Sequence, residues 1–231
     1  MYKPDGLKIR RRTWFQLANI PVKSTGWRLE DCNDLDHETQ EFVKSWVLKV
    51  QAKKVIRAYG EKLAGKGLFF TGDPGYGKST LASAVLQEML TTFSLEQFST
   101  QGSVLIRPCY FASYNEVLDL KGRIIGHDTT EFEEKLFQGL LGDCADDAHN
   151  VRVFVIDDVD KHHFSASGWQ KTLLNDIIRR RYSNGLPTIV TTNVAAKDIK
   201  DMYGDAAGSF LNEAFIPLTI KSSRGDLRLG T

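Results

Sequence analysis

One stretch of the sequence has the residue types and the spacing of a phosphate-binding loop. Residues 72 to 79 read Gly-Asp-Pro-Gly-Tyr-Gly-Lys-Ser and match the pattern G-x-x-x-x-G-K-S/T. Glycines allow such a loop to fold tightly with its N–H groups turned inward, and the start of the following helix attracts the same anion. Lys78 can reach the β- and γ-phosphates of ATP, and the Ser79 hydroxyl can bind Mg²⁺. The predicted phosphate-binding residues are Gly72, Asp73, Pro74, Gly75, Tyr76, Gly77, Lys78 and Ser79.

Two carboxylates follow an apolar run further along the chain. Residues 153 to 156 are Val-Phe-Val-Ile, typical of a strand buried on both faces, and Asp157 and Asp158 come next. In this Walker B pattern Asp157 is placed to hold Mg²⁺ opposite Ser79, and Asp158 is placed to orient or deprotonate an attacking water. Hydrolysing enzymes more often have Glu at the second position, so we expect a slower base or one that acts through an additional water. An acidic turn without a catalytic role is the alternative.

A third strand ends in polar residues. Residues 187 to 193 read Pro-Thr-Ile-Val-Thr-Thr-Asn. The Asn193 amide offers a donor and an acceptor, so at a strand end it can touch the γ-phosphate or the attacking water. Polar strand ends are common, so this one alone is weak evidence for a site. Its position after the first two motifs is what makes Asn193 a candidate. The sequence therefore predicts Lys78, Asp158 and Asn193 as catalytic residues.

Alternating strands and helices are expected to position these residues. Apolar runs predict strands at residues 67–71, 104–111, 151–158, 186–190 and 215–220. Helical spacing predicts helices at residues 37–59, 80–93, 116–125, 130–141, 167–182, 195–203 and 206–214, with a turn at 60–67. The alternation indicates an α/β fold with a five-stranded parallel sheet that binds ligands at the carboxyl ends of its strands. Pro108 interrupts the second strand, which suggests an edge position or a bulge.

The composition excludes several classes of protein. The 231 residues are enough for one substantial domain with an extension. Lys and Arg number 30 against 29 for Asp and Glu, so any nucleic-acid site must be a local patch. Three scattered cysteines without a CxxC pair argue against a disulfide framework and a zinc module, and fit a reducing cytoplasm. We find no apolar run that could span a membrane and no signal-peptide pattern.

The first 36 residues differ from the rest in charge and pattern. They look irregular, and as far as Leu29 the basic residues, with Arg10, Arg11 and Arg12 at their centre, outnumber the single acid Asp5. Aromatic residues are interleaved with them, which is typical of a contact surface for nucleic acid or a partner protein. A solvated arm whose aromatic side chains pack on the domain is the alternative. We divide the chain into a basic N-terminal arm, 1–36, and an ATPase domain, 37–231.

The motifs in their order resemble those of a known family. After the phosphate-binding loop and the strand with two carboxylates come Ile-Ile-Arg-Arg-Arg-Tyr at residues 177–182 and Leu-Pro-Thr-Ile-Val-Thr-Thr-Asn at residues 186–193. This combination looks like the AAA+ ATPases of the DnaC type, the bacterial and phage replicative helicase loaders, to which the IstB-type transposition helpers are related. The resemblance covers residues 18 to 228 and implies a three-layer P-loop NTPase fold of the AAA+ (ASCE) kind. It also implies ATP-controlled loading of a hexameric helicase onto single-stranded DNA.

The resemblance implies roles for single residues as well. Thr80 would lie beside the phosphates, Asn193 would be sensor 1, and Arg228 would contact the nucleotide. The expected partners are a replicative hexameric helicase and single-stranded DNA, with self-assembly on either. Residues implied to line a single-stranded DNA track are Tyr114, Lys121 and Arg123.

The sequence departs from the family pattern in two places. Where the family has an arginine finger near its last helix, this chain has Phe210. Either an arginine among residues 179–181 or Arg224 replaces it, or hydrolysis between subunits is weak or depends on a partner, since a finger contributes roughly 10³- to 10⁵-fold in rate. A full helical lid needs more residues than follow the last strand, so we expect an ATPase domain without a full C-terminal lid.

Two alternatives to helicase loading stay open at this point. An IstB-type transposition helper would use the same machinery with a different partner. A nucleotide-gated DNA- or protein-binding module would hydrolyse little ATP, which Asp158 and Phe210 favour. A small-molecule kinase would need an acceptor pocket and an arginine-rich lid, and the sequence indicates neither.

Overall fold

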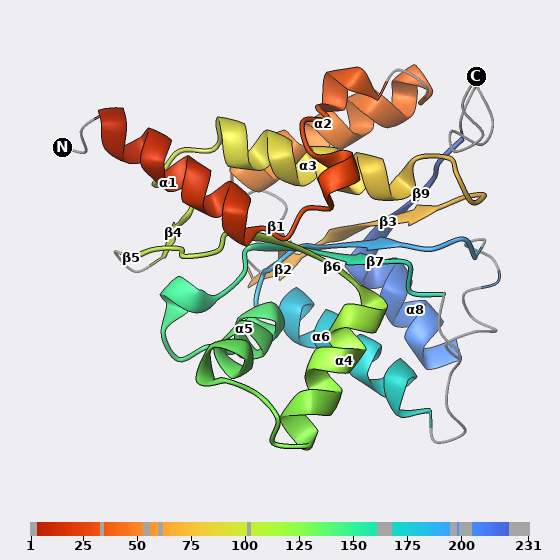
Figure 1. Ribbon diagram of the computed structural model, residues 1–231. Coiled ribbons are helices and arrows are strands. Elements are labelled where there is room, and N and C mark those ends of the chain that lie inside the picture. Colours follow the sequence, from red (N-terminus) through yellow and green to blue (C-terminus); the bar gives the residue numbers. More distant parts are fainter. Residues whose placement is uncertain are drawn as a thin grey trace.

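A parallel sheet of five strands runs through the centre of the protein, as predicted (Figure 1). Its strands are β3 (Gly67–Thr71), β6 (Cys109–Ser113), β7 (Val153–Asp157), β8 (Thr188–Thr191) and β9 (Phe215–Thr219). They lie in the order β6-β7-β8-β3-β9, and each strand is parallel to its neighbours. The computed structural model describes residues 4–32, 35–52, 56–59, 62–100, 103–160, 168–194, 198 and 205–221.

Helices cover both faces of the sheet and complete the predicted three layers (Figure 1). One face carries α1 (Pro4–Leu17), α2 (His37–Gln51) and α3 (Lys78–Thr92); the other carries α4 (Tyr114–Ile125), α5 (Glu131–Leu141), α6 (Trp169–Ser183) and α8 (Asp205–Ala214). Successive side chains of a strand point to opposite faces. In β3, Leu68 and Phe70 accordingly join the buried cluster on the α3 side, and Phe69 joins the cluster on the other side.

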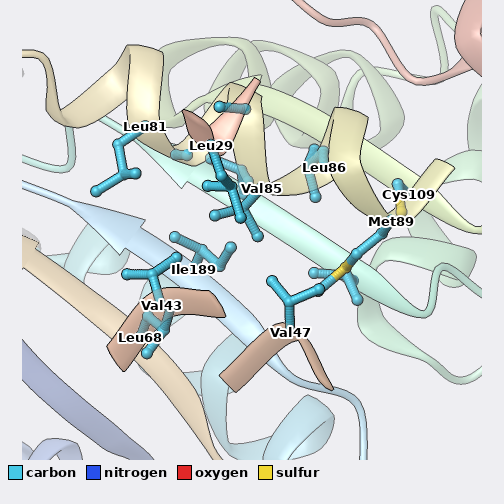
Figure 2. Close-up of a cluster of buried hydrophobic side chains, with 14 of the residues drawn as sticks. Leu29, Val43, Val47, Leu68, Leu81, Val85, Leu86, Met89, Cys109 and Ile189 are labelled. Atoms are coloured by element: carbon cyan, nitrogen blue, oxygen red, sulfur yellow. The ribbon is translucent and has the colours of Figure 1, made fainter. Parts of the chain in front are cut away.

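Helix α3 is fixed to the sheet by an apolar contact (Figure 2). Leu81, Val85 and Met89 lie one helical turn apart on α3 and are at most 1% exposed. They share one buried cluster with Leu68 of β3 and Ile189 of β8. Burial of a side chain of this size contributes about 1.5–3 kcal/mol. The helix that follows the phosphate-binding loop therefore has a defined position on the sheet.

The first 36 residues are not the irregular arm that the sequence predicts. Residues Pro4–Leu17 form the helix α1, and Trp14 on this helix has no exposed surface. The indole Nε1 donates a hydrogen bond to the Leu105 carbonyl at 2.9 Å, and the ring meets Phe98 edge-on with centroids 5.1 Å apart. The alternative, in which aromatic side chains pack on the domain, is confirmed for Trp14. Few apolar residues accompany it on α1, so the helical period is weak in the sequence.

The end of α1 occupies the open edge of β6. The Phe111 amide donates to the Ala18 carbonyl at 2.9 Å, and the Asn19 side-chain amide donates to the Phe111 carbonyl, also at 2.9 Å. The guanidinium of Arg107 donates to the Leu17 carbonyl at 3.0 Å. The two bonds of Phe111 satisfy backbone groups that an edge strand otherwise leaves exposed. The residues around 18 are therefore part of the sheet's own hydrogen bonding.

The predicted helix at residues 37–59 is too long. Helix α2 begins after Asp36, whose carboxylate accepts a hydrogen bond from the Thr39 amide at 2.8 Å, and it ends at Gln51. Residues Ile56–Tyr59 form β1, which pairs antiparallel with β2 (Lys62–Gly65), where a turn was expected. Ile and Tyr suit a strand as well as a helix face, so their spacing alone assigned them wrongly.

The second predicted strand is divided. Val104 lies in the short β5 (Ser103–Val104), which pairs antiparallel with β4 (Ser99–Thr100), and the parallel strand β6 begins only at Cys109. β6 is an edge strand, as the proline before it suggested.

Trp169, which the helical period places on a buried face, is 38% exposed at the start of α6. Short 3-10 helices span Val22–Ser24, Leu29–Asp31 and Asp147–His149.

The predictions for α4 and α5 are confirmed to within a residue or two. Ser113 caps α4 and Thr130 caps α5, and in each the glutamate at the third helical position completes a capping box. The predicted helix at 195–203 falls outside the described residues except for residue 198. No helix in the described part of the chain is long and apolar enough to cross a membrane.

Candidate nucleotide-binding site

The phosphate-binding loop connects the end of β3 to the start of α3, where the sequence placed it. Gly72, Gly75 and Gly77 have φ values of 138°, 86° and 81°, which favour glycine. A Cβ atom on Gly72 would lie 2.4 Å from the Ile220 carbonyl oxygen, so a side chain there would collide with the chain after β9. Both the backbone angles and the packing therefore require glycine in this loop.

Lys78 curls back over the loop. Its Nζ donates hydrogen bonds to the Gly72 carbonyl at 2.7 Å and the Asp73 carbonyl at 2.8 Å, and the residue is 5% exposed. Ser79 and Thr80 follow in the first turn of α3 and are half-buried. A cation held within a glycine-rich turn, at the start of a helix, suits the phosphates of a nucleotide.

Asp157 and Asp158 lie at the end of β7, and Thr191 of the neighbouring β8 connects them. The Thr191 hydroxyl donates to the Asp157 carboxylate and accepts a hydrogen bond from the Asp158 amide at 2.9 Å. Asp158 has a φ of 56°, in the left-handed region, and the Val159 amide donates to the Thr191 carbonyl at 3.1 Å. The hydroxyl of Thr191 thus fixes both the carboxylate predicted to hold Mg²⁺ and the backbone of the predicted base.

Asn193 follows β8 and is bound to Asp160. The Asp160 carboxylate accepts hydrogen bonds from the Asn193 backbone amide, the Asn193 side-chain amide and the Thr192 hydroxyl. Burial raises the pKa of Asp160, but these hydrogen bonds lower it more, so the pKa lies below the ordinary value of an aspartate. At neutral pH this carboxylate is therefore charged.

The three motifs meet at one edge of the sheet. β7, β8 and β3 are neighbours, and the carboxyl ends of parallel strands lie at the same edge. The Thr192 amide donates to the Phe70 carbonyl at 3.0 Å, which joins the end of β8 to β3 just before the phosphate-binding loop. The predicted placement of the motifs is confirmed, while the chemical roles of Lys78, Asp158 and Asn193 stay predictions.

The donor set at this edge fits ATP with Mg²⁺. A serine hydroxyl and an aspartate carboxylate are the hard oxygen ligands that Mg²⁺ prefers, and Mg²⁺ takes its other ligands from phosphates and water. Among the described residues, no group of three or more His, Cys, Asp or Glu side chains gathers to hold a metal by itself. Ser79 and Asp157 would therefore hold the ion together with the nucleotide.

Comparison with known proteins decides the family. Residues 68–207 match the model of the "ATPase family associated with various cellular activities (AAA)". The protein is an AAA-family member. Family membership supports nucleotide binding and ATPase activity in general, and it agrees with the loop, carboxylates and amide found at the sheet edge.

Among its relatives, this AAA protein is similar to replicative helicase loaders. It is 26% identical over 159 residues to the replicative helicase loader DnaC of Escherichia coli K12, covering 68% of this chain and 55% of the relative. The chain thus spans about half the length of the curated relatives that it matches. The expected resemblance to the DnaC type is confirmed.

Solved structures show the same fold. The crystal structure of the DnaC helicase loader superposes with a TM-score of 0.58 at 24% identity, covering 87% of this chain and all of that one. The DnaI structure gives 0.57 at 18% identity, with coverage of 91% and 95%. AMPPCP-bound DnaA from Aquifex aeolicus gives 0.53 at 15% identity, covering 88% of this chain and 51% of that one. The predicted P-loop AAA+ fold is confirmed.

The predicted DNA-track residues of the AAA domain do not share one environment. Tyr114 has no exposed surface, burial raises the pKa of its hydroxyl, and that hydroxyl donates to the Gln170 carbonyl. The prediction that the Tyr114 side chain contacts DNA is therefore wrong. Lys121 lies with Nζ 5.1 Å from the Phe137 ring centre, and Arg123 pairs with Glu133. Both remain candidates, since they lie at the surface or half-buried.

The three basic residues of α1 also differ. Arg12 is exposed and Arg10 half-buried. Arg11 donates from a guanidinium nitrogen to the Phe93 carbonyl at 3.2 Å, at the end of α3. Arg11 therefore attaches α1 to the domain, which leaves Arg10 and Arg12 as the better candidates for contacts outside the protein.

Arginines 179–181 have three different roles. Arg181 is fully buried, and Arg180 forms ion pairs with Asp143 and Asp176. Arg179 is exposed, and its guanidinium lies 4.1 Å from the ring centre of Phe210, the residue at the expected finger position. Of these three, Arg179 is the one placed to reach a neighbouring molecule. Arg224 and Arg228, the other predicted arginines, lie outside the described residues.

Sequence reasoning missed the role of Arg181. Its Nε donates to the Thr188 hydroxyl at 2.9 Å, and its terminal nitrogens donate to backbone carbonyls where α5 ends and where β7 and β8 begin. Burial lowers the pKa of Arg181 to about 9, so the guanidinium is still charged at pH 7. A signal existed in the sequence: Arg181 follows Leu174, Ile177 and Ile178 on the apolar face of α6.

Proposed function

We propose that this protein binds and hydrolyses ATP and loads a replicative hexameric helicase onto single-stranded DNA. One observation carries the proposal. The phosphate-binding loop, the two carboxylates and the strand-end amide occupy the carboxyl ends of three adjacent strands in a chain similar to the loader DnaC. Such a protein would act in the cytoplasm of a bacterium or of a host infected by a phage.

Each residue of the site would have its own role in ATP hydrolysis. Lys78 and the loop amides would bind the β- and γ-phosphates and neutralise their charge. Ser79 and Asp157 would hold Mg²⁺, which supplies further positive charge at the phosphates. Asp158 would orient the water and accept its proton, and Asn193 would hydrogen-bond the water or the γ-phosphate.

Hydrolysis by the isolated protein is expected to be slow. Asp158 is shorter than a glutamate, and Phe210 offers no positive charge. Arg181 cannot compensate because it is buried and bound to five acceptors. A partner that brings a cation to the γ-phosphate, or a second copy that presents Arg179, would then accelerate turnover.

The experiment measures ATP turnover by the protein alone, with single-stranded DNA, and with the host's hexameric helicase. We expect turnover that one or both partners stimulate, together with co-elution of protein and helicase in size-exclusion chromatography. The Asp158→Asn variant should bind ATP as wild type does and lose turnover by at least about 100-fold, the usual contribution of a positioned base.

Two outcomes would contradict this proposal. Turnover that survives in Asp158→Asn would show that Asp158 is not the base. Nucleotide binding without turnover, and without helicase binding, would instead favour a nucleotide-gated module.

Arg10 and Arg12 of α1 are proposed to contact DNA phosphates. An Arg10→Ala/Arg12→Ala variant should bind single-stranded DNA more weakly, and the slope of log K against log salt should fall by about 0.7 for each lost phosphate contact. Arg11 is kept because it attaches α1 to α3. The control, Lys49→Ala/Lys135→Ala, removes the same charge from exposed sites on α2 and α5. Equal effects of the two double variants would mean that only net charge matters.

A further inference from the structure

Asp160 makes more contacts with Asn193 than a turn requires. Its Oδ1 accepts from the Thr192 hydroxyl at 2.8 Å and from the Asn193 backbone amide at 2.9 Å. Its Oδ2 accepts from the Asn193 side-chain Nδ2 at 2.8 Å. The two oxygens of one carboxylate thus hold the backbone and the side chain of the same residue.

These bonds define where the Asn193 side chain points. The backbone bonds alone would satisfy the turn after β8, to which the Val194 amide adds a hydrogen bond to the Thr192 hydroxyl at 3.1 Å. The bond to Nδ2 does nothing for the backbone and acts only on the side chain. An amide has two N–H donors and one carbonyl oxygen, so one N–H and the oxygen remain to meet a ligand in a fixed direction.

Asp160 also ties Asn193 to the strand that carries the carboxylates. It lies three residues after Asp157, in the turn that follows β7, and both residues are bonded to the end of β8. Asp157 and Asp158 use Thr191, whereas Asp160 uses Thr192 and Asn193. Hydrogen bonds at successive positions therefore connect the ends of β7 and β8. They fix the carboxylates of β7 and the Asn193 amide relative to one another.

We propose that Asp160 is a positioning residue for ATP hydrolysis, which orients the Asn193 amide toward the nucleotide. The inference rests on the proposed function, and it deepens it by adding a residue that touches neither substrate nor metal. A misplacement of a reacting group by about 1 Å costs about 100-fold in rate, so an untied Asn193 should act poorly.

The experiment compares Asp160→Ala, Asn193→Ala and the double variant with wild type. One assay measures single-turnover ATP hydrolysis in the presence of helicase and single-stranded DNA, and a second measures the binding of a fluorescent ATP analogue. We expect each single variant to lose roughly 10- to 100-fold in rate, with analogue affinity changed less than about twofold. The double variant should lose no more than Asn193→Ala, because the two residues act as a unit. Multiplied losses, or unchanged or faster turnover in Asp160→Ala, would overturn the inference.

Asp160→Asn provides a second variant in case alanine impairs folding. Its side-chain oxygen can still accept from the Thr192 hydroxyl and the Asn193 backbone, but its NH₂ group would face the Asn193 NH₂ group. In ¹H–¹⁵N NMR spectra of the nucleotide-free protein, the Asn193 side-chain amide signals should shift in Asp160→Asn. Absence of a shift would overturn the inference whether or not the protein hydrolyses ATP.

A matched control separates positioning from stability. Like Asp160, Asp36 accepts hydrogen bonds from the backbone amide and the side chain of a single residue, in this case the amide and the hydroxyl of Thr39 at the start of α2. Asp36→Ala should lower the melting temperature by a few degrees, about as Asp160→Ala does, and leave turnover unchanged. If the wild-type protein shows no ATP turnover, the proposed function is refuted. If the wild type turns over ATP, Asn193→Ala is slower and Asp160→Ala is as fast as wild type, only the role of Asp160 is refuted.

Discussion

Lys78→Ala is expected to abolish tight ATP binding. The ammonium group is already desolvated and held by the Gly72 and Asp73 carbonyls, so it meets the phosphates with little reorganisation. Truncation of one partner in such a charged contact costs about 2–5 kcal/mol, which corresponds to an affinity loss of roughly 30- to 4,000-fold. Isothermal titration with a non-hydrolysable ATP analogue measures the loss directly.

Thermal unfolding checks the same prediction independently. A ligand at 100 times its Kd stabilises a folded protein by about 2.7 kcal/mol, so wild type should melt at a higher temperature with ATP than without it. The Lys78→Ala variant should show no such shift, and Lys49→Ala, an exposed lysine on α2, should shift as wild type does. Unchanged affinity in Lys78→Ala would refute the assignment of the phosphate-binding loop.

Arg181→Met is expected to destabilise the fold by about 3–5 kcal/mol. The substitution keeps an unbranched apolar stem but removes the donor to five buried acceptors, one hydroxyl and four carbonyl oxygens. Of these, the Pro187 carbonyl keeps a long hydrogen bond of 3.5 Å from the Phe154 amide. Each buried acceptor without a partner costs about 1–3 kcal/mol, of which water and relaxation recover a part. Urea unfolding followed by circular dichroism gives the free energy of unfolding.

Arg180→Met is the matched control for Arg181. It removes the neighbouring arginine, whose ion pairs with Asp143 and Asp176 are exposed to solvent and contribute at most about 1 kcal/mol. Equal destabilisation by both variants would contradict the structural role of Arg181.

The stability difference between the two variants should not depend on pH near neutrality. Burial lowers the pKa of Arg181 to about 9, so folding disfavours its protonated form. This cost to the free energy of folding is relieved only as the pH rises above about 9. Between pH 5 and 8 the difference between the variants should not change.

The sequence predicted the sheet and the site where one strong local pattern decides the outcome. Val153–Asp157 is apolar throughout, and the motif at 72–79 needs its glycines for backbone reasons that hold in any context. Parallel strands then bring Asp157 and Asn193 to one edge without further information. Local chemistry also sufficed for the helix predicted at 116–125, since a serine, Ser113, caps the start of α4.

Other features depend on contacts between distant segments, and local pattern could not reveal them. Trp14 is buried because residues 98 and 105 form its surroundings, and α1 has little apolar pattern of its own. The family resemblance placed Tyr114 on a DNA track, but its side chain is buried and its hydroxyl donates to the Gln170 carbonyl of α6. Asp160 is an ordinary loop aspartate until the pairing of β7 with β8 places it beside Asn193.

The hydrogen bonds that join Ala18 and Asn19 to β6 bear on how a partner would meet this protein. A disordered tail that folds on binding loses conformational entropy at that moment, which weakens its affinity. Here α1 is already folded, with Trp14 buried and with Ala18 and Asn19, directly after the helix, bonded to the sheet edge. A partner that binds its outer face therefore meets a rigid surface and pays no ordering penalty. A partner that pulled α1 away would expose an unpaired strand edge, which invites pairing with other chains.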